Sequence, residues 1–402
     1  MKNIAKVIVK AHHEKRLIEG NPWIFSNEIE NFSSLKNLEK GSLIEVEIYK
    51  QPHFALAYFN PHSLISCRIL SYNSVEKIDE SFFVKKINKA QILREKFFDK
   101  PFYRLVNSEG DRLPGLIIDR FDNIFVCQIS TAGMENLKPF LILALKEIFK
   151  NCQIIFRNNS ELRALEKLES SLDFECVDDV VIPEKITVIE NDLEFTIDLK
   201  NGQKTGWFFD QAVNRNFVAS LVKDCDVFDG FCYVGGFGIN AVKAQARSVI
   251  FADSSKEALD LTRENCQKIV EKFNPACETS FYNKKIFDLL EDAEFQKRSF
   301  DVILLDPPAF VKNKKDLFSG LRGYEKLVKL ACPLLKKNGY LIITSCSHHV
   351  STQDLVLAVQ HALHKSHKNG KLIRTYGAGF DHPIHPALKE NEYLKCLTFF
   401  IE

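Results

Sequence analysis

The stretch Asp226-Val227-Phe228-Asp229-Gly230-Phe231-Cys232-Tyr233-Val234-Gly235-Gly236-Phe237-Gly238 decides the fold of the C-terminal half of the chain. It begins as a short apolar strand, continues as a glycine-rich loop and leads into a helix that we expect to begin near Ile239. Glycines in such a loop let the backbone approach a ligand closely, because a Cβ atom there would collide with it. Ligands of open α/β sheets bind at the carboxyl ends of the strands, where this loop lies. The pattern therefore predicts a ligand site at the loop.

Short, nearly continuous apolar strands alternate with helical segments around this loop. They are Val227-Phe228, Val249-Ile250-Phe251, Val302-Ile303-Leu304-Leu305 and Leu341-Ile342-Ile343. Strands of this kind are buried on both faces, as in a parallel sheet covered by helices. Before the last strand we expect a helix that reaches Leu335 and carries Lys336 and Lys337 at its C-terminal end. The sequence thus predicts an α/β fold with a mostly parallel sheet for residues 185–402.

Two smaller domains are expected before this one, because 402 residues exceed one ordinary domain. Strand patterns dominate residues 1–74, which we interpret as a small β-rich domain. These strands are Met1–Lys10, Leu43–Tyr49, Phe54–Phe59 and Leu64–Leu70. Residues 75–184 mix both types and predict an α+β middle domain. Its elements are a helix over Asp79–Phe98, a hairpin around Asp122-Asn123, a helix over Met134–Phe149 and a strand at Ile154–Phe156.

Composition excludes several classes of protein. Hydrophobic residues make up 45% of the chain and charged residues 27%, which argues against disorder. The net charge of +1 means that any site for a polyanion must come from local clustering. The 11 cysteines form no C-x-x-C pair, so we expect reduced thiols and no metal site. No stretch approaches the roughly 18 apolar residues of a membrane span, and we expect a cytoplasmic protein without a membrane partner.

Acidic residues follow the strands that flank the glycine loop. Asp229 ends the first strand, and Asp253 with Ser254 ends the next one. An acidic residue at this second place can accept hydrogen bonds from both hydroxyls of a ribose. A glycine run alone is equally compatible with a structural turn, but its position before Asp253 favours a nucleoside cofactor. The expected cofactor-binding residues of this region are Asp229, Gly235, Gly236, Gly238, Asp253 and Ser254.

A third candidate strand ends at Phe287-Asp288, where Asp288 suits the edge of an adenine. NAD is the competing nucleoside cofactor, and the loop does not give the spacing G-x-G-x-x-G that is typical of NAD sites. The segment that follows favours methyl transfer from S-adenosylmethionine instead.

That segment, Leu304-Leu305-Asp306-Pro307-Pro308-Ala309-Phe310, ends a buried strand. The Pro-Pro pair cannot continue a ladder and stiffens the turn. A rigid turn would hold Asp306 at the sheet edge for hydrogen bonds in the plane of a base, with Phe310 close enough to stack on it. The alternative is a simple strand end with Phe310 in the core. We expect Asp306 in catalysis and cofactor binding, and Pro307, Pro308 and Phe310 in substrate binding.

The next strand ends in Thr344-Ser345-Cys346-Ser347-His348-His349, and we expect it beside or near the strand of Asp306. A free cysteine is most often a small buried hydrophobe, but this one faces the same crevice as Asp306. C5 of cytosine is a poor nucleophile, and attack of a thiolate on C6 would activate it for methylation. We therefore expect Cys346 to be a nucleophile. His348 and His349 either assist proton removal or bind phosphate, or they are structural.

These blocks resemble a known family, the bacterial class I 23S ribosomal RNA cytosine-5 methyltransferases with an N-terminal PUA domain. The resemblance covers almost the whole chain, with its blocks in the family's order. They are Asn21-Pro22-Trp23-Ile24-Phe25, Arg112-Leu113-Pro114-Gly115-Leu116 with Asp119-Arg120, Lys204–Gln211 with Asn214-Arg215, the glycine loop, Asp306–Phe310 and Ser345–His349.

The resemblance implies a PUA domain over 1–74, a middle domain over 75–184 and a Rossmann-like class I methyltransferase domain over 185–402. It also implies S-adenosylmethionine as cofactor, large-subunit ribosomal RNA as partner and Cys346 as the attacking thiol. In such enzymes one segment closes over the cofactor. The resemblance places Lys204, Phe208, Gln211 and Arg215 in this segment and therefore implies that they bind the cofactor. The glycine loop departs from the family at Cys232 and Val234, where Ser and Thr are expected.

Basic residues outnumber acidic ones between Lys312 and Lys337 and could meet RNA phosphates near the base pocket. They are Lys312, Lys314, Lys315, Arg322, Lys326, Lys329, Lys336 and Lys337, against Asp316 and Glu325. The alternative is a solvated helix face. We count Lys312 among the substrate-binding residues.

Two other functions stay open at this point. The motif at Asp306–Phe310 also resembles enzymes that methylate amino or ring nitrogens of guanine or adenine, which need no thiol. A non-enzymatic RNA-binding factor that keeps a cofactor fold would show no methyl transfer. The sequence does not fix the oligomeric state, and a homodimer stays open.

Overall fold

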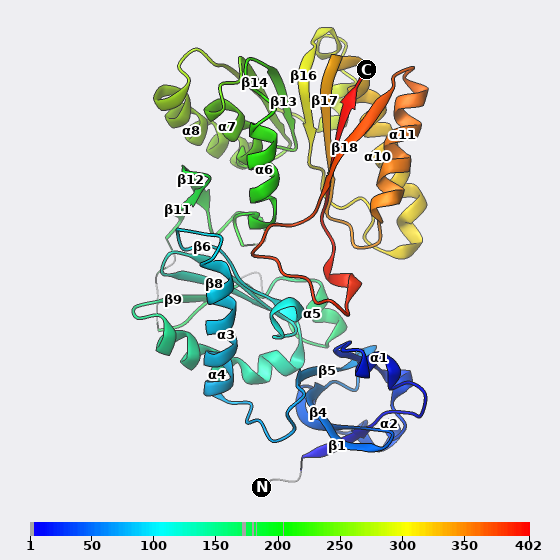
Figure 1. The fold of residues 1–402 in the computed structure, drawn as a ribbon. Coiled ribbons are helices and arrows are strands. Elements are labelled where there is room, and N and C mark those ends of the chain that lie inside the picture. The colour runs from blue at the N-terminus through cyan, green and yellow to red at the C-terminus, as the bar shows by residue number, and fades with distance from the viewer. Residues whose placement is uncertain (1–3, 171–173, 179–180, 182, 204) are drawn as a thin grey trace. The chain divides into compact units, whose positions relative to one another are not determined.

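The computed structural model describes residues 4–170, 174–178, 181, 183–203 and 205–402 (Figure 1). The chain divides into two compact units. The first is Met1–Glu184 with Phe380–Asn391, and the second is Lys185–Gly379 with Glu392–Glu402. Phe380–Asn391 therefore packs with the first unit, although it falls in the range 185–402 predicted for the last domain.

The first unit contains a five-stranded sheet built from the N-terminal strands, in the order β1-β3-β4-β5-β2. The strands are β1 (Ala5–Ile8), β2 (Trp23–Phe25), β3 (Ser42–Ile48), β4 (Gln51–Phe59) and β5 (Ile65–Ser71), with the short helices α1 (Lys15–Ile18) and α2 (Phe32–Leu35). Alternating burial along β3 places Ile44, Val46 and Ile48 in one apolar core. The predicted β-rich domain is confirmed.

A second five-stranded sheet in this unit has the order β10-β9-β8-β7-β6. Its elements are α3 (Glu80–Arg94), β6 (Phe102–Asn107), β7 (Leu116–Phe121), β8 (Ile124–Ile129), α4 (Ala132–Ile148), β9 (Gln153–Phe156), α5 (Leu162–Leu165) and β10 (Glu175–Cys176). Asp79 caps α3 by accepting hydrogen bonds from the backbone of Ser81 (3.1 Å) and Phe82 (3.4 Å). The hairpin turns at Asp122 in the left-handed region (φ 57°). The predicted mixed α/β character is confirmed.

Buried hydrogen bonds to Asp381 hold Phe380–Asn391 in the first unit. Arg94 is fully buried and binds both carboxylate oxygens of Asp111 at 2.6 and 2.7 Å. It also donates to the carbonyl of Asp381, whose carboxylate accepts from the backbone of Arg104. Because an unpaired buried charge is strongly destabilising, these partners fix one another.

The second unit has a hairpin and a seven-stranded sheet, in the order β15-β14-β13-β16-β17-β19-β18. The hairpin pairs β11 (Lys185–Glu190) with β12 (Leu193–Asp198). The sheet contains β13 (Asp226–Gly230), β14 (Ser248–Asp253), β15 (Glu278–Asn283), β16 (Phe300–Leu305), β17 (Leu335–Ser345), β18 (Gly370–Tyr376) and β19 (Lys395–Ile401). Its first five strands are parallel, and β19 runs antiparallel to both β17 and β18.

Helices cover both faces of this sheet (Figure 1). They are α6 (Ala212–Ala219), α7 (Gly236–Lys243), α8 (Lys256–Phe273), α9 (Ile286–Leu290), α10 (Leu317–Ala331) and α11 (Thr352–Lys365). Leu327, Val328 and Leu355 from α10 and α11 share one core with Leu305 and Ile343 from the sheet. The predicted Rossmann-like α/β fold is confirmed.

The order of the strands reverses between β13 and β16. The chain moves outward from β13 to β14 and β15, then returns to the other side of β13 with β16 and β17. Loops on the two sides of such a switch point diverge, so a crevice opens at the carboxyl ends of the strands. The glycine loop follows β13, and Asp306 follows β16.

Two local predictions are wrong. Phe287-Asp288 does not end a strand but lies in α9, and the third strand ends at Asn283. This strand is a half-exposed edge strand and lacks the apolar run of the inner ones. Lys336 and Lys337 lie in β17 and not at a helix end, because Pro333 and the 3₁₀ turn Cys332–Leu334 end the helical segment earlier. In the part of the chain that the structure covers, no helix is both long and apolar enough to span a bilayer.

Candidate active site

The glycine loop is tightly packed at three positions. Gly235 adopts φ +82°, a left-handed conformation that favours glycine, just before α7. A Cβ atom on Gly236 would lie 2.6 Å from Nε of Arg215. A Cβ atom on Gly238 would lie 2.2 Å from a ring carbon of Phe251 and 2.9 Å from Asp229 Oδ2. The helix α7 begins at Gly236, three residues earlier than expected from the sequence.

Asp229 lies at the end of β13 and is buried. Its Oδ2 accepts a 2.8 Å hydrogen bond from the backbone of Gly238, and its Oδ1 is buried without a partner in the structure as described. Burial raises the pKa of Asp229 to about 7, and the negative charges of Asp306 and Asp253 act in the same direction. A buried carboxylate oxygen without a donor is unfavourable, so the site fits a ligand that brings a donor or a positive charge.

Asp253 lies at the end of β14 and also holds the glycine loop. Its Oδ2 accepts a hydrogen bond from the backbone of Tyr233 (2.9 Å), and its Oδ1 accepts one from Ser255 (2.8 Å). The side chain is half-buried, and carboxylate oxygens have further lone pairs for hydroxyl groups. Ser254 is exposed beside it, and Asp288 is exposed in the first turn of α9.

The segment before and within α6 is tied to the same edge of the sheet. Gln211 is buried and donates to both carboxylate oxygens of Asp306 at 3.2 Å. Arg215 is buried, and its Nη1 donates to both carboxylate oxygens of Glu190 (2.8 Å) while its Nη2 donates to the carbonyl of Phe208 (3.0 Å). Its Nε is buried without a partner among the described residues. Lys204 lies outside the residues that the structure describes.

Asp306 follows β16 and contacts the neighbouring strand. Thr344, near the end of β17, donates a hydrogen bond from its hydroxyl to Asp306 Oδ1. Together with the two bonds from Gln211, this contact orients the carboxylate. The expected neighbourhood of the two strands is confirmed, because β16 and β17 pair in parallel with Leu305 opposite Ile343.

Cys346 is the first residue after β17 and is half-buried. The hydroxyls on either side of it are anchored: Ser345 accepts from Tyr324 (2.8 Å), and Ser347 accepts from the backbone of Val311 (3.4 Å). These contacts fix the turn that carries the thiol. Thr344, which binds Asp306, is two residues before Cys346. The thiol therefore lies at the same carboxyl ends of the strands as Asp306.

Lys395 lies against this turn. It begins β19 opposite Ser345, and it is 6% exposed. Its ammonium group donates to the carbonyls of Ser347 (2.9 Å) and Tyr393 (3.0 Å). Burial lowers the pKa of Lys395, and the negative charge of a Cys346 thiolate opposes that shift. A buried positive charge therefore lies within electrostatic reach of the thiol.

Other residues predicted at the substrate site differ in their surroundings. Pro307 is buried and Pro308 is exposed. The ring of Phe310 packs on Tyr324 with centroids 4.7 Å apart and joins the core cluster. This contact agrees with the alternative interpretation, in which Phe310 belongs to the hydrophobic core and does not stack on a base. Lys312, His348 and His349 are exposed, and the ring of His348 lies 5.4 Å from that of Tyr393.

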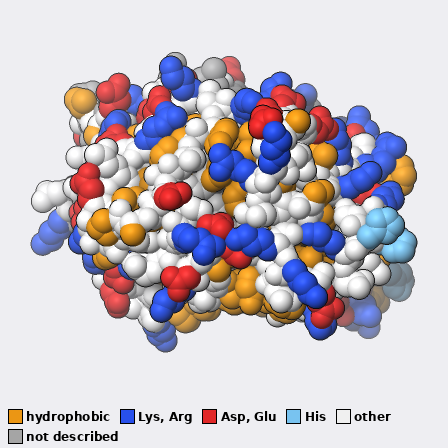
Figure 2. Space-filling model, turned by 90° about the horizontal axis from the view of Figure 1, so that it is seen from above, with side chains coloured by type: hydrophobic (Ala, Val, Ile, Leu, Met, Phe, Trp, Pro, Cys, Tyr) orange, Lys and Arg blue, Asp and Glu red, His pale blue; other side chains and the backbone are white. Residues whose placement is uncertain are grey.

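The basic run from Lys312 to Lys337 does not form one surface. Lys336 pairs with Asp226 (2.6 Å) and Asp301 (2.9 Å), which lie at the opposite edge of the sheet from Asp306. In Figure 2, Lys and Arg side chains are scattered among acidic and apolar ones on the face shown.

Comparison with known proteins places this geometry in a family. Residues 7–72 match PUA-like domains, and residues 167–365 match S-adenosylmethionine-dependent methyltransferases. The ribosomal RNA large subunit methyltransferase I of Aliivibrio fischeri strain MJ11 is 34% identical over 95% of this chain and 96% of its own length. That of Vibrio vulnificus strain CMCP6 is 33% identical over 97% and 98%. The chain belongs to the ribosomal RNA large subunit methyltransferase I family.

Solved structures agree on the fold. A methyltransferase crystallised in complex with SAH has a TM-score of 0.81 at 19% identity and covers 99% of this chain and 100% of that one. A SAM-dependent methyltransferase from Streptococcus mutans has a TM-score of 0.80 with the same identity and coverage. The present member of the methyltransferase I family is thus an S-adenosylmethionine-dependent methyltransferase with a PUA-like domain.

The described residues fit that cofactor. Asp229 offers a buried, unpartnered carboxylate oxygen, and Arg215 offers an unpartnered Nε beside Gly236. Such polar atoms are normally satisfied in a folded protein, which indicates that a polar ligand belongs beside them. Asp253 presents a half-exposed carboxylate at the next strand end. No group of three His, Cys, Asp or Glu in the described ranges is arranged to hold a metal.

Sequence reasoning missed three contributors to this site in the methyltransferase I chain. Thr344 stood in the quoted motif, and its place just before the strand end was the available signal. Glu190, the partner of Arg215, lies 25 residues earlier in β11 and gave no local signal. Lys395 gave none either, because its role depends on the pairing of β19 with β17.

Proposed function

We propose that this chain methylates C5 of a cytidine in large-subunit ribosomal RNA, through a covalent adduct between Cys346 and C6 of the base. The observation that carries the proposal is the juxtaposition of Asp306 and Cys346 after two adjacent parallel strands, with Thr344 bound to Asp306. Relatives named ribosomal RNA large subunit methyltransferase I support the RNA as substrate.

In the proposed reaction the thiolate of Cys346 adds to C6, forming an S–C6 bond and moving the electron pair of the C5–C6 double bond to C5. S-adenosylmethionine would supply an electrophilic methyl group to C5, with cleavage of its S–CH3 bond and release of S-adenosylhomocysteine. A base then removes the proton from C5, the C5–C6 double bond re-forms and the thiolate leaves. The thiol is regenerated, and the base gains one methyl group.

Asp306 has the geometry to orient the base for this attack. Three hydrogen-bond contacts from Gln211 and Thr344 hold its carboxylate, so it is preorganised to accept a hydrogen bond from the exocyclic amino group of cytosine. Pro308, exposed beside it, would contact the base. His348, His349 and Lys312 are exposed nearby and suit contacts to RNA phosphates.

The cofactor would lie across the carboxyl ends of β13 and β14. We assign its contacts to the loop residues Gly235, Gly236 and Gly238, to the side chains of Asp229 and Asp253 and to those of Gln211 and Phe208. Arg215 acts through its unpartnered Nε. Ser254 and Asp288 are exposed at the same edge and remain candidates for the adenosine end.

The test is a trapping experiment with RNA in which cytidine is replaced by 5-fluorocytidine. Fluorine at C5 cannot be removed as a proton is, so the S–C6 bond persists and the enzyme stays attached to the RNA in a denaturing gel. Wild-type protein with S-adenosylmethionine should give this adduct and should give 5-methylcytosine with ordinary rRNA. Cys346→Ala should give neither.

Cys225→Ala is the matched control. Cys225 is likewise a half-buried thiol, but it precedes β13 at the opposite edge of the sheet. It should leave the adduct and the product unchanged. Formation of 5-methylcytosine by Cys346→Ala would overturn the mechanism, and methylated guanine or adenine in the nucleoside mass spectrum would establish the nitrogen-methylating alternative that the motif Asp306–Phe310 suggests.

A further inference from the structure

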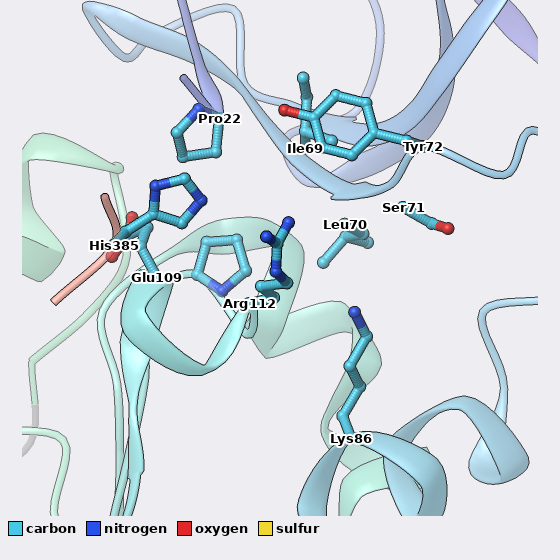
Figure 3. Close-up of a pocket in the computed structure, with 10 residues that line it drawn as sticks. Pro22, Ile69, Leu70, Ser71, Tyr72, Lys86, Glu109, Arg112 and His385 are labelled. Atoms are coloured by element: carbon cyan, nitrogen blue, oxygen red, sulfur yellow. The ribbon is translucent and has the colours of Figure 1, made fainter. Parts of the chain in front are cut away.

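A small pocket in the first unit, far along the chain from the strand ends described above, gathers two cationic side chains, Lys86 and Arg112, that form no ion pair with a described carboxylate. Its volume is about 70 Å³, the space of roughly two water molecules and enough for one phosphate group. Four of the lining side chains come from separate segments: Tyr72 follows β5, Lys86 lies on α3, Arg112 follows the 3₁₀ turn Ser108–Asp111, and His385 belongs to Phe380–Asn391. Figure 3 shows Arg112 and Lys86 reaching toward the same space below Ile69 and Tyr72.

The carboxylates around the pocket are engaged by other groups. Glu109 is buried and accepts hydrogen bonds from Arg68 (2.8 Å), Trp23 (2.9 Å) and Ser108 (2.6 Å). Glu76, close to Lys86 in space, binds Lys85 at 3.0 Å and also accepts from the hydroxyl of Ser71. Within the described part of the chain, no carboxylate lies within hydrogen-bonding distance of the side chain of Lys86 or of Arg112.

The two cations therefore destabilise each other while the pocket holds no anion. Burial lowers the pKa of Lys86 to about 8, and the positive charges of Arg112, Lys89 and Lys85 add to this effect against Glu76. Arg112 likewise acts with burial to lower the pKa of His385. An anion between the two side chains would reverse this repulsion, and phosphate oxygens suit both an ammonium and a guanidinium group.

We propose that Lys86 and Arg112 together bind one phosphate of single-stranded RNA. An RNA phosphate is favoured over a free anion because the rim carries the ring of Tyr72, which is 40% exposed. An aromatic ring beside paired cations is the usual arrangement for a nucleotide, since the base stacks while the phosphate is neutralised. The inference rests on the proposed RNA substrate but not on the chemistry of Cys346.

Binding is measured with full-length Cys346→Ala protein and large-subunit rRNA transcribed in vitro, over a series of KCl concentrations. Arg112→Gln and Lys86→Gln should each weaken binding roughly three- to tenfold and lower the slope of log K against log[KCl] by about 0.7 to 1. Because both cations bind the same phosphate, the double variant should lose little more than either single one. Lys89→Gln, which removes a lysine one turn away that does not line the pocket, is the matched control and should change neither quantity.

A second measurement does not depend on substitution. A lysine with a lowered pKa reacts readily with an acylating reagent near neutral pH, so mass spectrometry should detect fast acylation of Lys86 and slow acylation of Lys89. Added rRNA should protect Lys86 selectively.

Four results would overturn the proposal: equal losses for Lys89→Gln and the pocket variants, no loss for the pocket variants, no binding of rRNA by the parent protein, or protection of Lys86 by inorganic phosphate but not by RNA. The last result would assign the pocket to a free anion. The binding measurements use Cys346→Ala protein, so they do not depend on methyl transfer. If the trapping experiment disproved the role of Cys346, these binding results would still hold. If Lys86 and Arg112 proved not to bind RNA, the proposed role of Cys346 would be unaffected.

Discussion

Replacement of Asp229 by Asn should change how the stability of the protein depends on pH. The carboxyl group is buried at the end of β13, and among the described residues one of its oxygens has a donor, the backbone of Gly238, while the other has none. Its pKa is raised from 3.8 to about 7, mainly by burial. The side chain of Asn keeps the same shape and can still accept from Gly238, but it cannot ionise.

The sign and size follow from the two pKa values. Between pH 4 and pH 7 the unfolded chain has lost this proton while the folded protein retains it, so the free energy of unfolding falls as the pH rises. The full effect of a shift of roughly 3 pH units is about 4 kcal/mol. Between about pH 5.5 and about pH 7.5 the expected loss is about 2 kcal/mol. Well above pH 7 the carboxyl group of Asp229 is ionised in both the folded and the unfolded protein, so its contribution to the free energy of unfolding no longer changes with pH.

The assay is urea unfolding of both proteins, without added cofactor, at these two pH values. For each protein the free energy of unfolding at the lower pH is compared with that at the higher pH. Subtracting the change for Asp229→Asn from the change for the wild type removes the contributions of all other titrating groups. The difference should be about 2 kcal/mol, with the wild type less stable at the higher pH. S-adenosylmethionine should stabilise the wild type more than the variant, because the carboxylate is then paired. A difference near zero between the two pH values would refute the reasoning, since it would mean that the folded protein hydrates this carboxylate.

Three further substitutions test the site. Gly238→Ala should destabilise the protein by about 1–3 kcal/mol in urea unfolding, because its Cβ atom would lie 2.2 Å from the ring of Phe251; unchanged stability would mean that α7 moves freely. Thr344→Val removes a hydrogen bond to the proposed catalytic carboxylate and should lower kcat/KM for methyl transfer about tenfold, roughly 1.4 kcal/mol, with cofactor affinity retained; equal activity would contradict this. Lys395→Met should slow alkylation of Cys346 by iodoacetamide at neutral pH several-fold, because a buried positive charge favours the thiolate; an unchanged rate would remove Lys395 from the site.

The inner strands of the second unit could be predicted from sequence because their burial is encoded locally. Strands buried on both faces, such as Phe300–Leu305, read as continuous apolar runs. The edge strand Glu278–Asn283 has no such run, since its side chains are half-exposed, and the apolar pairs that follow it belong to α9. Apolar residues at Ile286, Leu289 and Leu290 have helical spacing, which was the discriminating signal.

The candidate site was predictable where each residue lies at a strand end and not where its position depends on distant partners. Asp306 and Cys346 follow consecutive parallel strands, so their common edge could be inferred from order alone. The position of Arg215 depends on Glu190 from a hairpin that precedes the sheet, and no local pattern encodes that pair. Phe310 shows the opposite limit, because an aromatic residue after a strand end fits both a stacking role and the core contact that the structure contains.

Ligand sites of open α/β sheets lie at the carboxyl ends of the parallel strands, and Lys395 shows that residues outside these ends also reach such a site. The rule holds for parallel strands, whose last residues share one edge. The strand β19 runs antiparallel to β17, so its first residue and not its last reaches that edge. A basic residue at the amino end of an antiparallel strand can therefore lie beside a thiol at the carboxyl end of its neighbour, here Cys346, 49 residues earlier in the chain. In sheets that insert one antiparallel strand next to a catalytic one, the start of the inserted strand is as informative as the ends of the others.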